Sequence, residues 1–184
     1  MRGGAGSLHT WVTMLRGINV GGRKRVSMEE LRACYLSLGF GKVLTYIQSG
    51  NVVFEDGSQD AQGLAERIEK GLEESFGLDV RVIIRPKEEM LKVIKNNPFK
   101  EREESRVHVT FLSALRVDIP MKEISAVKDK TEEFYISGRE VYLFCPNGYG
   151  RTKLSNSFLE RKLETYATTR NWRTVNALYA LQSG

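Results

Sequence analysis

Cysteine, histidine and long apolar runs are all scarce in this sequence, and each scarcity excludes a class of protein. The 184 residues include two cysteines, Cys34 and Cys145, and two histidines, His9 and His108. Their spacing matches no common ligand pattern, so we expect neither a metal site nor a cofactor, and so few cysteines fit a reducing cytoplasm better than a disulfide framework. No apolar run approaches the roughly 20 residues that span a bilayer. The sequence therefore predicts a cytoplasmic protein without a membrane segment.

A recognisable catalytic signature is also missing. Ser49 has no base evident in the sequence, His9 and His108 lie in apolar strand contexts, and no motif places a pair of acidic residues. The residues that would carry catalysis are therefore not identified.

Two nucleotide-binding motifs fail on inspection. Gly17 and Gly22 have the separation of a Walker A loop, but Arg23 and Lys24 follow where a lysine and a hydroxyl residue are required. Gly50–Phe54 lacks the aromatic pattern by which an RNA-recognition motif stacks bases. Nucleoside-triphosphate hydrolysis and that mode of RNA binding are not supported.

Positive charge is concentrated near the beginning of the chain. The net charge is +5, and residues 2–25 hold five lysines or arginines and no acid, so the other 23 bases balance the 23 acids. This basic stretch contains the glycine-rich segment Leu15–Gly22, which continues the apolar run Trp11–Leu15. We interpret Trp11–Leu15 as a central strand buried on both faces, and the loop after it as the best candidate for a site.

The segments after this loop carry the start and stop signals of two helices. Ser27 and Glu30 have the spacing of a capping box, and Gly39 supplies a left-handed stop. A second apolar pattern begins near Ser58 or Asp60 and ends at Gly77. Three more strands are expected at Val43–Gln48, Val52–Glu55 and Val80–Ile84, with a hairpin turn at Ser49–Asn51. This order of elements predicts an α+β fold of the ferredoxin-like split βαβ type, with antiparallel strand order 4-1-3-2.

The second half of the chain repeats this order. A linking helix at Lys87–Asn96 precedes a strand at Val107–Leu112, and Thr168 and Thr169 offer hydroxyls to cap the last helix. The other expected elements are a helix at Met121–Val127, strands at Phe134–Ile136 and Val141–Phe144, and a helix capped by Ser155 or Asn156. We therefore expect two such subdomains in tandem: a flexible tail over 1–9, a first subdomain over 10–86, and a linking helix with a second subdomain over 87–184.

The candidate ligand-binding residues lie in two glycine-rich basic loops, in the hairpin turn and in the segment before the last helix. In strand order 4-1-3-2 the first loop and the hairpin turn emerge at the same end of the sheet, so Gly17–Val26 and Ser49–Asn51 should be neighbours. Glycine lets the backbone approach a ligand closely, and N–H groups at a helix start favour anions. The segment Asn147–Leu154 repeats this chemistry. The candidates are Arg16, Gly17, Asn19, Gly21, Gly22, Arg23, Lys24, Ser27, Ser49, Gly50, Asn51, Arg151, Lys153, Arg170 and Asn171.

Four segments in order carry a resemblance to a known family. They are Leu15–Gly22, Gln48–Asn51, Gly150–Leu154 and Thr168–Trp172. Together they resemble the domain-of-unknown-function 1697 family, a mainly prokaryotic group, over about Thr10 to Leu181. The resemblance implies an α+β fold and shared positions, and it assigns no activity.

Three interpretations of the basic loops remain open at this point. A non-enzymatic module that binds an anionic small molecule bearing phosphate, or nucleic acid, explains them with the fewest assumptions. The alternative is an enzyme of unknown reaction that acts on a small anionic substrate in a cleft between the subdomains. In the third, the glycines only turn the chain and the bases are solvated. We also predict that Arg151, Lys153 and Arg170 share one surface with Arg16 and Lys24.

Overall fold

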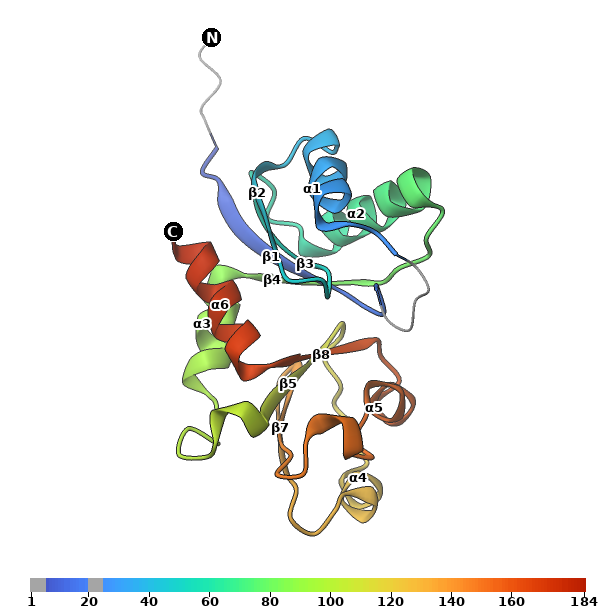
Figure 1. Cartoon of the computed structure of the whole chain (residues 1–184), viewed down its shortest axis with the longest axis vertical. Helices are drawn as coiled ribbons and strands as arrows, with labels where there is room; N and C mark the ends of the chain where they lie inside the picture. The colour runs from blue at the N-terminus through green and yellow to red at the C-terminus, as the bar shows by residue number, and fades with distance from the viewer. Residues whose placement is uncertain (1–5, 20–24) are drawn as a thin grey trace. The chain divides into compact units, whose positions relative to one another are not determined.

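The computed structural model describes residues 6–19 and 25–184, which fold into two compact units (Figure 1). The first unit contains the chain up to Met90 together with Leu178–Gly184, and the second contains Leu91–Ala177. Each unit has a four-stranded antiparallel sheet with helices. The predicted α+β class and the two similar subdomains are therefore confirmed.

The sheet of the first unit has the strand order β2-β3-β1-β4, which is the predicted 4-1-3-2 arrangement. The interior strand β1 pairs with β3 on one side and β4 on the other, and its residues from Trp11 to Leu15 are all buried, as predicted. The elements are β1 (His9–Leu15), α1 (Met28–Ser37), β2 (Gly41–Tyr46), β3 (Asn51–Asp56), α2 (Ala61–Phe76) and β4 (Val82–Pro86).

Helices α1 and α2 both lie on one face of this sheet and enclose the core of the unit (Figure 1). Helix α1 contributes the buried residues Leu31 and Tyr35. In α2 an apolar residue recurs every fourth position, at Leu64, Ile68 and Leu72, which are buried, and at Phe76, which is partly buried against the same core. The predicted capping box at Ser27 is present, and α2 begins after Asp60 and ends at Gly77 in the left-handed conformation. Local signals and apolar periodicity therefore agree in placing both helices.

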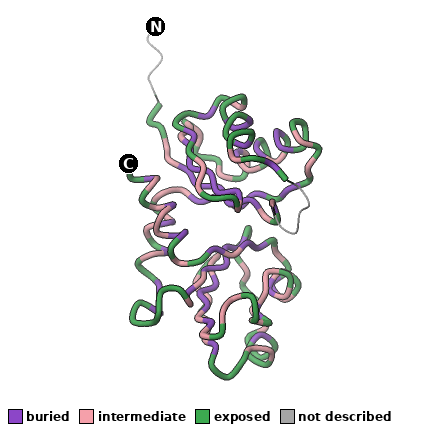
Figure 2. Tube along the Cα trace, viewed as in Figure 1, coloured by how far each residue is buried: buried purple, intermediate pink, exposed green. Residues whose placement is uncertain are grey.

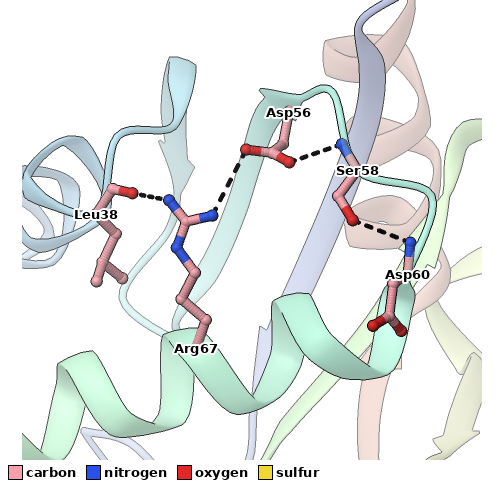
Figure 3. A network of polar contacts seen from close by, with 5 residues as sticks. All are labelled: Leu38, Asp56, Ser58, Asp60 and Arg67. Carbon is pink, nitrogen blue, oxygen red and sulfur yellow. Dashed lines mark hydrogen bonds and ion pairs between the residues drawn. The ribbon is translucent and has the colours of Figure 1, made fainter.

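A polar network joins α2 to the end of α1 and the end of β3 (Figure 3). The Arg67 guanidinium donates to the Leu38 carbonyl, lies 3.8 Å from the Asp56 carboxylate and covers the Phe40 ring at 4.5 Å. The second Asp56 oxygen accepts from the Ser58 N–H at 2.8 Å, and the Ser58 hydroxyl accepts from the Asp60 N–H at 3.1 Å. This chain of contacts fixes the connection from β3 into α2.

The second unit repeats the sheet order as β6-β7-β5-β8, again with the first strand in the interior. Helices α4 and α5 cover one face, with Ile124, Leu159 and Leu163 buried against Val141 and Leu143. Buried positions follow the strands of each unit, as Figure 2 shows. The elements are the 3-10 turn η1 (Glu104–Arg106), β5 (Val107–Leu112), α4 (Met121–Val127), β6 (Glu133–Ser137), β7 (Glu140–Phe144), the 3-10 turn η2 (Tyr149–Arg151), α5 (Asn156–Leu163) and β8 (Ala167–Asn171). Helices α3 (Lys87–Lys95) and α6 (Trp172–Ser183) continue from one unit into the other.

Three local predictions are wrong. Strand β4 spans Val82–Pro86 rather than Val80–Ile84. Strand β2 ends at Tyr46 rather than Gln48, because Ile47 has a φ of 49° and the Asn51 amide donates to the Tyr46 carbonyl, which closes the turn. The hydroxyls of Thr168 and Thr169 do not cap the last helix, because both residues belong to β8 and pair with β5. The Asn171 carboxamide oxygen instead accepts from the Thr174 N–H at 2.8 Å at the start of α6.

We predict that Tyr35→Phe lowers the free energy of unfolding by about 1–2 kcal/mol, the usual value of a buried hydrogen bond. The Tyr35 hydroxyl lies 2.7 Å from the Thr13 hydroxyl in the core, and burial raises its pKa above the usual range. Urea denaturation measures the effect. Tyr135→Phe removes a hydroxyl from a half-exposed ring and is the control, with an expected change below about 0.5 kcal/mol. Equal losses in the two variants would contradict the prediction.

Candidate functional site

Main-chain hydrogen bonds bring the first glycine-rich loop against the β2–β3 hairpin. The Leu15 N–H donates to the Gly50 carbonyl at 3.0 Å, and the Arg16 N–H donates to the Arg81 carbonyl at 2.9 Å. The loop therefore leaves β1 between the hairpin and the start of β4. The described ends of Gly17–Val26 and the turn Ser49–Asn51 are neighbours, as the predicted topology requires.

Asn19 closes this loop with its side-chain amide. Its Nδ2 donates to the carbonyls of Val26 and Gln48, both at 2.9 Å, and its Oδ1 accepts from the Val26 N–H at 2.9 Å. The residue itself has a φ of 56°, a conformation that asparagine tolerates better than most residues. Asn19 therefore holds the two ends of the loop together and ties them to the hairpin.

The hairpin turn is held by equally specific contacts. Gly50 has a φ of 76°, and a Cβ at this position would lie 2.5 Å from Cγ2 of Ile18. The buried Asn51 amide donates to the Ser49 hydroxyl at 2.8 Å and to the Tyr46 carbonyl at 3.0 Å. Glycine and asparagine are therefore required here by the shape of the turn.

Ser27 begins α1 through the reciprocal contacts of its capping box. The Ser27 hydroxyl accepts from the Glu30 N–H at 3.1 Å, and the Glu30 carboxylate accepts from the Ser27 N–H at 3.0 Å. Hydrogen bonds from the Ser27 backbone and then its side chain hold the pKa of Glu30 below its usual value. The predicted N–H donors at the helix start are thus partly occupied.

These elements surround a pocket with a volume of ≈ 470 Å³. We call it the loop pocket, and it is lined by Asn19, Arg25, Val26, Ser27 and Gln48. Asn19 and Ser27 were predicted site residues, whereas Arg25 and Gln48 were not, although both adjoin predicted ones. Gly21, Gly22, Arg23 and Lys24 lie outside the described residues.

The predicted cations of the second unit have different environments. Arg151 and Lys153 are exposed on the segment that follows β7. Arg170 is buried in β8, where its guanidinium donates to the Thr168 hydroxyl at 2.6 Å and to the Thr169 carbonyl at 3.0 Å. Burial lowers the pKa of Arg170 to about 10. A common surface of these cations with Arg16 and Lys24 stays a prediction.

One pocket of the second unit has a volume of ≈ 590 Å³, and we call it the His108 pocket. Of the predicted residues it contains Asn171. His108 was not predicted, because its sequence neighbours Val107 and Val109 are apolar, but neighbours in a strand point to opposite faces of the sheet. The lining residues are Glu103, Glu104, Ser105, His108, Asn171 and Arg173.

Neither a cluster of metal ligands nor an exposed cysteine thiol is found in residues 6–19 and 25–184. No three histidine, cysteine or acidic residues of this part gather as metal ligands. Cys34 and Cys145 are buried free thiols, and burial raises the pKa of Cys145 to about 11, so its thiol stays protonated at neutral pH. None of the helices in these residues is long and apolar enough to cross a membrane.

We predict that Asn19→Asp lowers the free energy of unfolding by about 1–3 kcal/mol, because it removes both amide donors and sets a carboxylate against two carbonyls. Urea denaturation followed by circular dichroism measures the loss. Asn147→Asp introduces the same charge at an exposed position and is the control. A loss no larger than that of the control would show that the amide does not hold the loop.

We predict that Gly50→Ala is more damaging, with about 1–2 kcal/mol from the positive φ and about 1–3 kcal/mol from the contact with Ile18. Thermal unfolding measures the sum. Gly57→Ala is the matched control, because nothing lies within 4 Å of a Cβ at Gly57. Wild-type stability of the Gly50 variant would disprove the close approach.

Comparisons with known proteins agree with this architecture. The chain has a fold similar to that of the conserved bacterial protein SP0830 from Streptococcus pneumoniae, with a TM-score of 0.72 and 25% sequence identity over 96% of this chain and 99% of that one. No curated protein matches the chain significantly. The model of a family described as "Protein of unknown function (DUF1697)" matches residues 8–142. The chain therefore belongs to the DUF1697 family, as its four sequence segments indicated.

Proposed function

We propose that the first unit is a binding module for a small phosphate-bearing ligand, held in the loop pocket. The observation that carries the proposal is the lining of this pocket, in which Arg25, Ser27 and Gln48 lie around one volume. These groups supply a cation and neutral hydrogen-bond donors, the combination that suits phosphate oxygens.

The electrostatic setting supports an anion. Within the part of the chain that the structure describes, no acidic residue lines the loop pocket. Helix α1 begins beside Ser27, so the positive end of its dipole is at the same place. Because the Glu30 carboxylate already accepts from the Ser27 N–H, Arg25 is the principal charged contact in this proposal.

The size of the pocket favours a small molecule over nucleic acid. A volume of ≈ 470 Å³ lies within the range of about 300–1,000 Å³ that is typical of pockets for small ligands. Nucleic acid would instead require an extended face with several cations, each neutralising one phosphate.

We predict that the chain binds inorganic pyrophosphate and that Arg25→Gln weakens binding about ten-fold, which corresponds to about 1.4 kcal/mol. Isothermal titration calorimetry at constant ionic strength measures both dissociation constants. Lys70→Gln is the matched control, because it removes one exposed positive charge from α2 in the same unit. Its affinity should stay within about two-fold of the wild type.

Three outcomes would overturn the proposal. Absence of pyrophosphate binding would remove its basis, and equal losses in the two variants would reduce the effect to net charge. Binding of a short DNA duplex with a steep dependence on salt, and no binding of pyrophosphate, would replace the small ligand with nucleic acid.

A further inference from the structure

The His108 pocket lies at the end of the second sheet where β5 begins, β8 ends and α6 starts. His108 and Asn171 face each other in the register of β5 and β8. The acidic residues of the pocket, Glu103 and Glu104, come from the segment leading into β5, and Arg173 comes from the first turn of α6. The segment before β5, β5 itself, β8 and α6 therefore all contribute polar side chains to one volume.

The His108 ring is held in place by contact with Tyr149. Its ring stacks on the Tyr149 ring, with centroids 5.0 Å apart and an interplanar angle of 23°. The Tyr149 hydroxyl donates to the Thr169 hydroxyl at 3.1 Å, and Thr169 in turn contacts Thr110 at 2.7 Å. Burial lowers the pKa of His108, which favours the neutral form of the imidazole.

The start of α6 gives the pocket an anion-binding side. The Asn171 carboxamide oxygen is used to cap the helix through the Thr174 N–H, which leaves its Nδ2 group as a donor to a ligand. Arg173 adds an exposed guanidinium, whose planar donors match a carboxylate. The positive end of the α6 dipole also favours a negatively charged group at this end of the helix.

The opposite charge is present in the same pocket. Glu103 already accepts from the Ser105 hydroxyl at 2.7 Å and lies 3.7 Å from the Arg106 guanidinium. Glu104 is exposed and supplies a second carboxylate. Two carboxylates disfavour a polyanion such as pyrophosphate and favour a ligand that carries its own positive group.

We propose that the His108 pocket binds a small zwitterion with the chemistry of a free α-amino acid. Its ammonium group pairs with Glu104, its carboxylate pairs with Arg173 and the Asn171 amide, and His108 forms a wall of the site. The volume of ≈ 590 Å³ accommodates a ligand of this size. This site is separate from the loop pocket and does not depend on the function proposed for it.

The presence of only two histidines makes the test direct. The full chain is labelled with ¹⁵N and ¹³C at histidine, the two ring signals are assigned with His9→Gln, and each of the common L-amino acids is titrated at constant pH. We expect at least one amino acid to shift the His108 signal saturably and to leave His9, in the first unit, unchanged. The amine and the carboxylic acid that correspond to this amino acid should each bind at least ten-fold more weakly.

Matched variants then test the two charged contacts. Arg173→Gln should weaken binding about ten-fold, whereas Arg161→Gln, an exposed arginine on α5, should not change it. Glu104→Gln should also weaken binding, with the exposed Glu101→Gln as its control.

The proposal is overturned by any of three results. These are the absence of a saturable His108 shift across the amino acids, parallel shifts of both histidines as a change of pH would give, and retention of full affinity when either the ammonium or the carboxylate of the ligand is removed.

Discussion

Two main-chain hydrogen bonds at the end of β1 determine where the first glycine-rich loop can go. The bonds from Leu15 to Gly50 and from Arg16 to Arg81 hold the interior strand to both of its neighbours at the point where the chain leaves the sheet. Asn19 can reach the Gln48 carbonyl only because this exit is fixed. The position of the loop pocket therefore follows from the sheet topology. Main-chain hydrogen bonds, and not the charge of Arg25, fix where the loop begins.

The second unit has corresponding main-chain hydrogen bonds, but the His108 pocket is not located beside them. Leu112 donates to the Arg139 carbonyl at 2.8 Å and Ser113 to the Tyr166 carbonyl at 2.9 Å, in the same positions relative to the sheet. The loop after β5 carries the exposed apolar residues Leu115 and Val117 in place of a glycine-rich basic segment. The His108 pocket lies at the other end of β5. The two units thus share an architecture, but the loop pocket and the His108 pocket lie at different positions within it.

The elements predicted best from the sequence are those whose signals are local. Helix α1 has its capping box, α2 has a four-residue apolar repeat between Asp60 and Gly77, and β1 contains the almost wholly apolar run Trp11–Leu15. Strand β8 is different, because Thr168, Thr169 and Arg170 form a polar run that resembles a helix cap. Its identity depends on pairing with β5, which lies about sixty residues earlier in the chain, and local patterns do not contain that information.

The same distinction applies to the candidate sites. Asn19, Gly50 and Asn51 were predicted as ligand contacts, and the structure gives each of them a role in holding the loop or the turn. All three lie inside the segments that carry the family resemblance. Of the side chains that give the pockets their charge, Arg25 and Arg173 lie just outside those segments, and Glu104 lies far from all of them in the sequence. In the loop pocket, the residues that hold the loop and the turn are therefore different from Arg25, which supplies the charge, so this charge can change by substitution without removing those contacts.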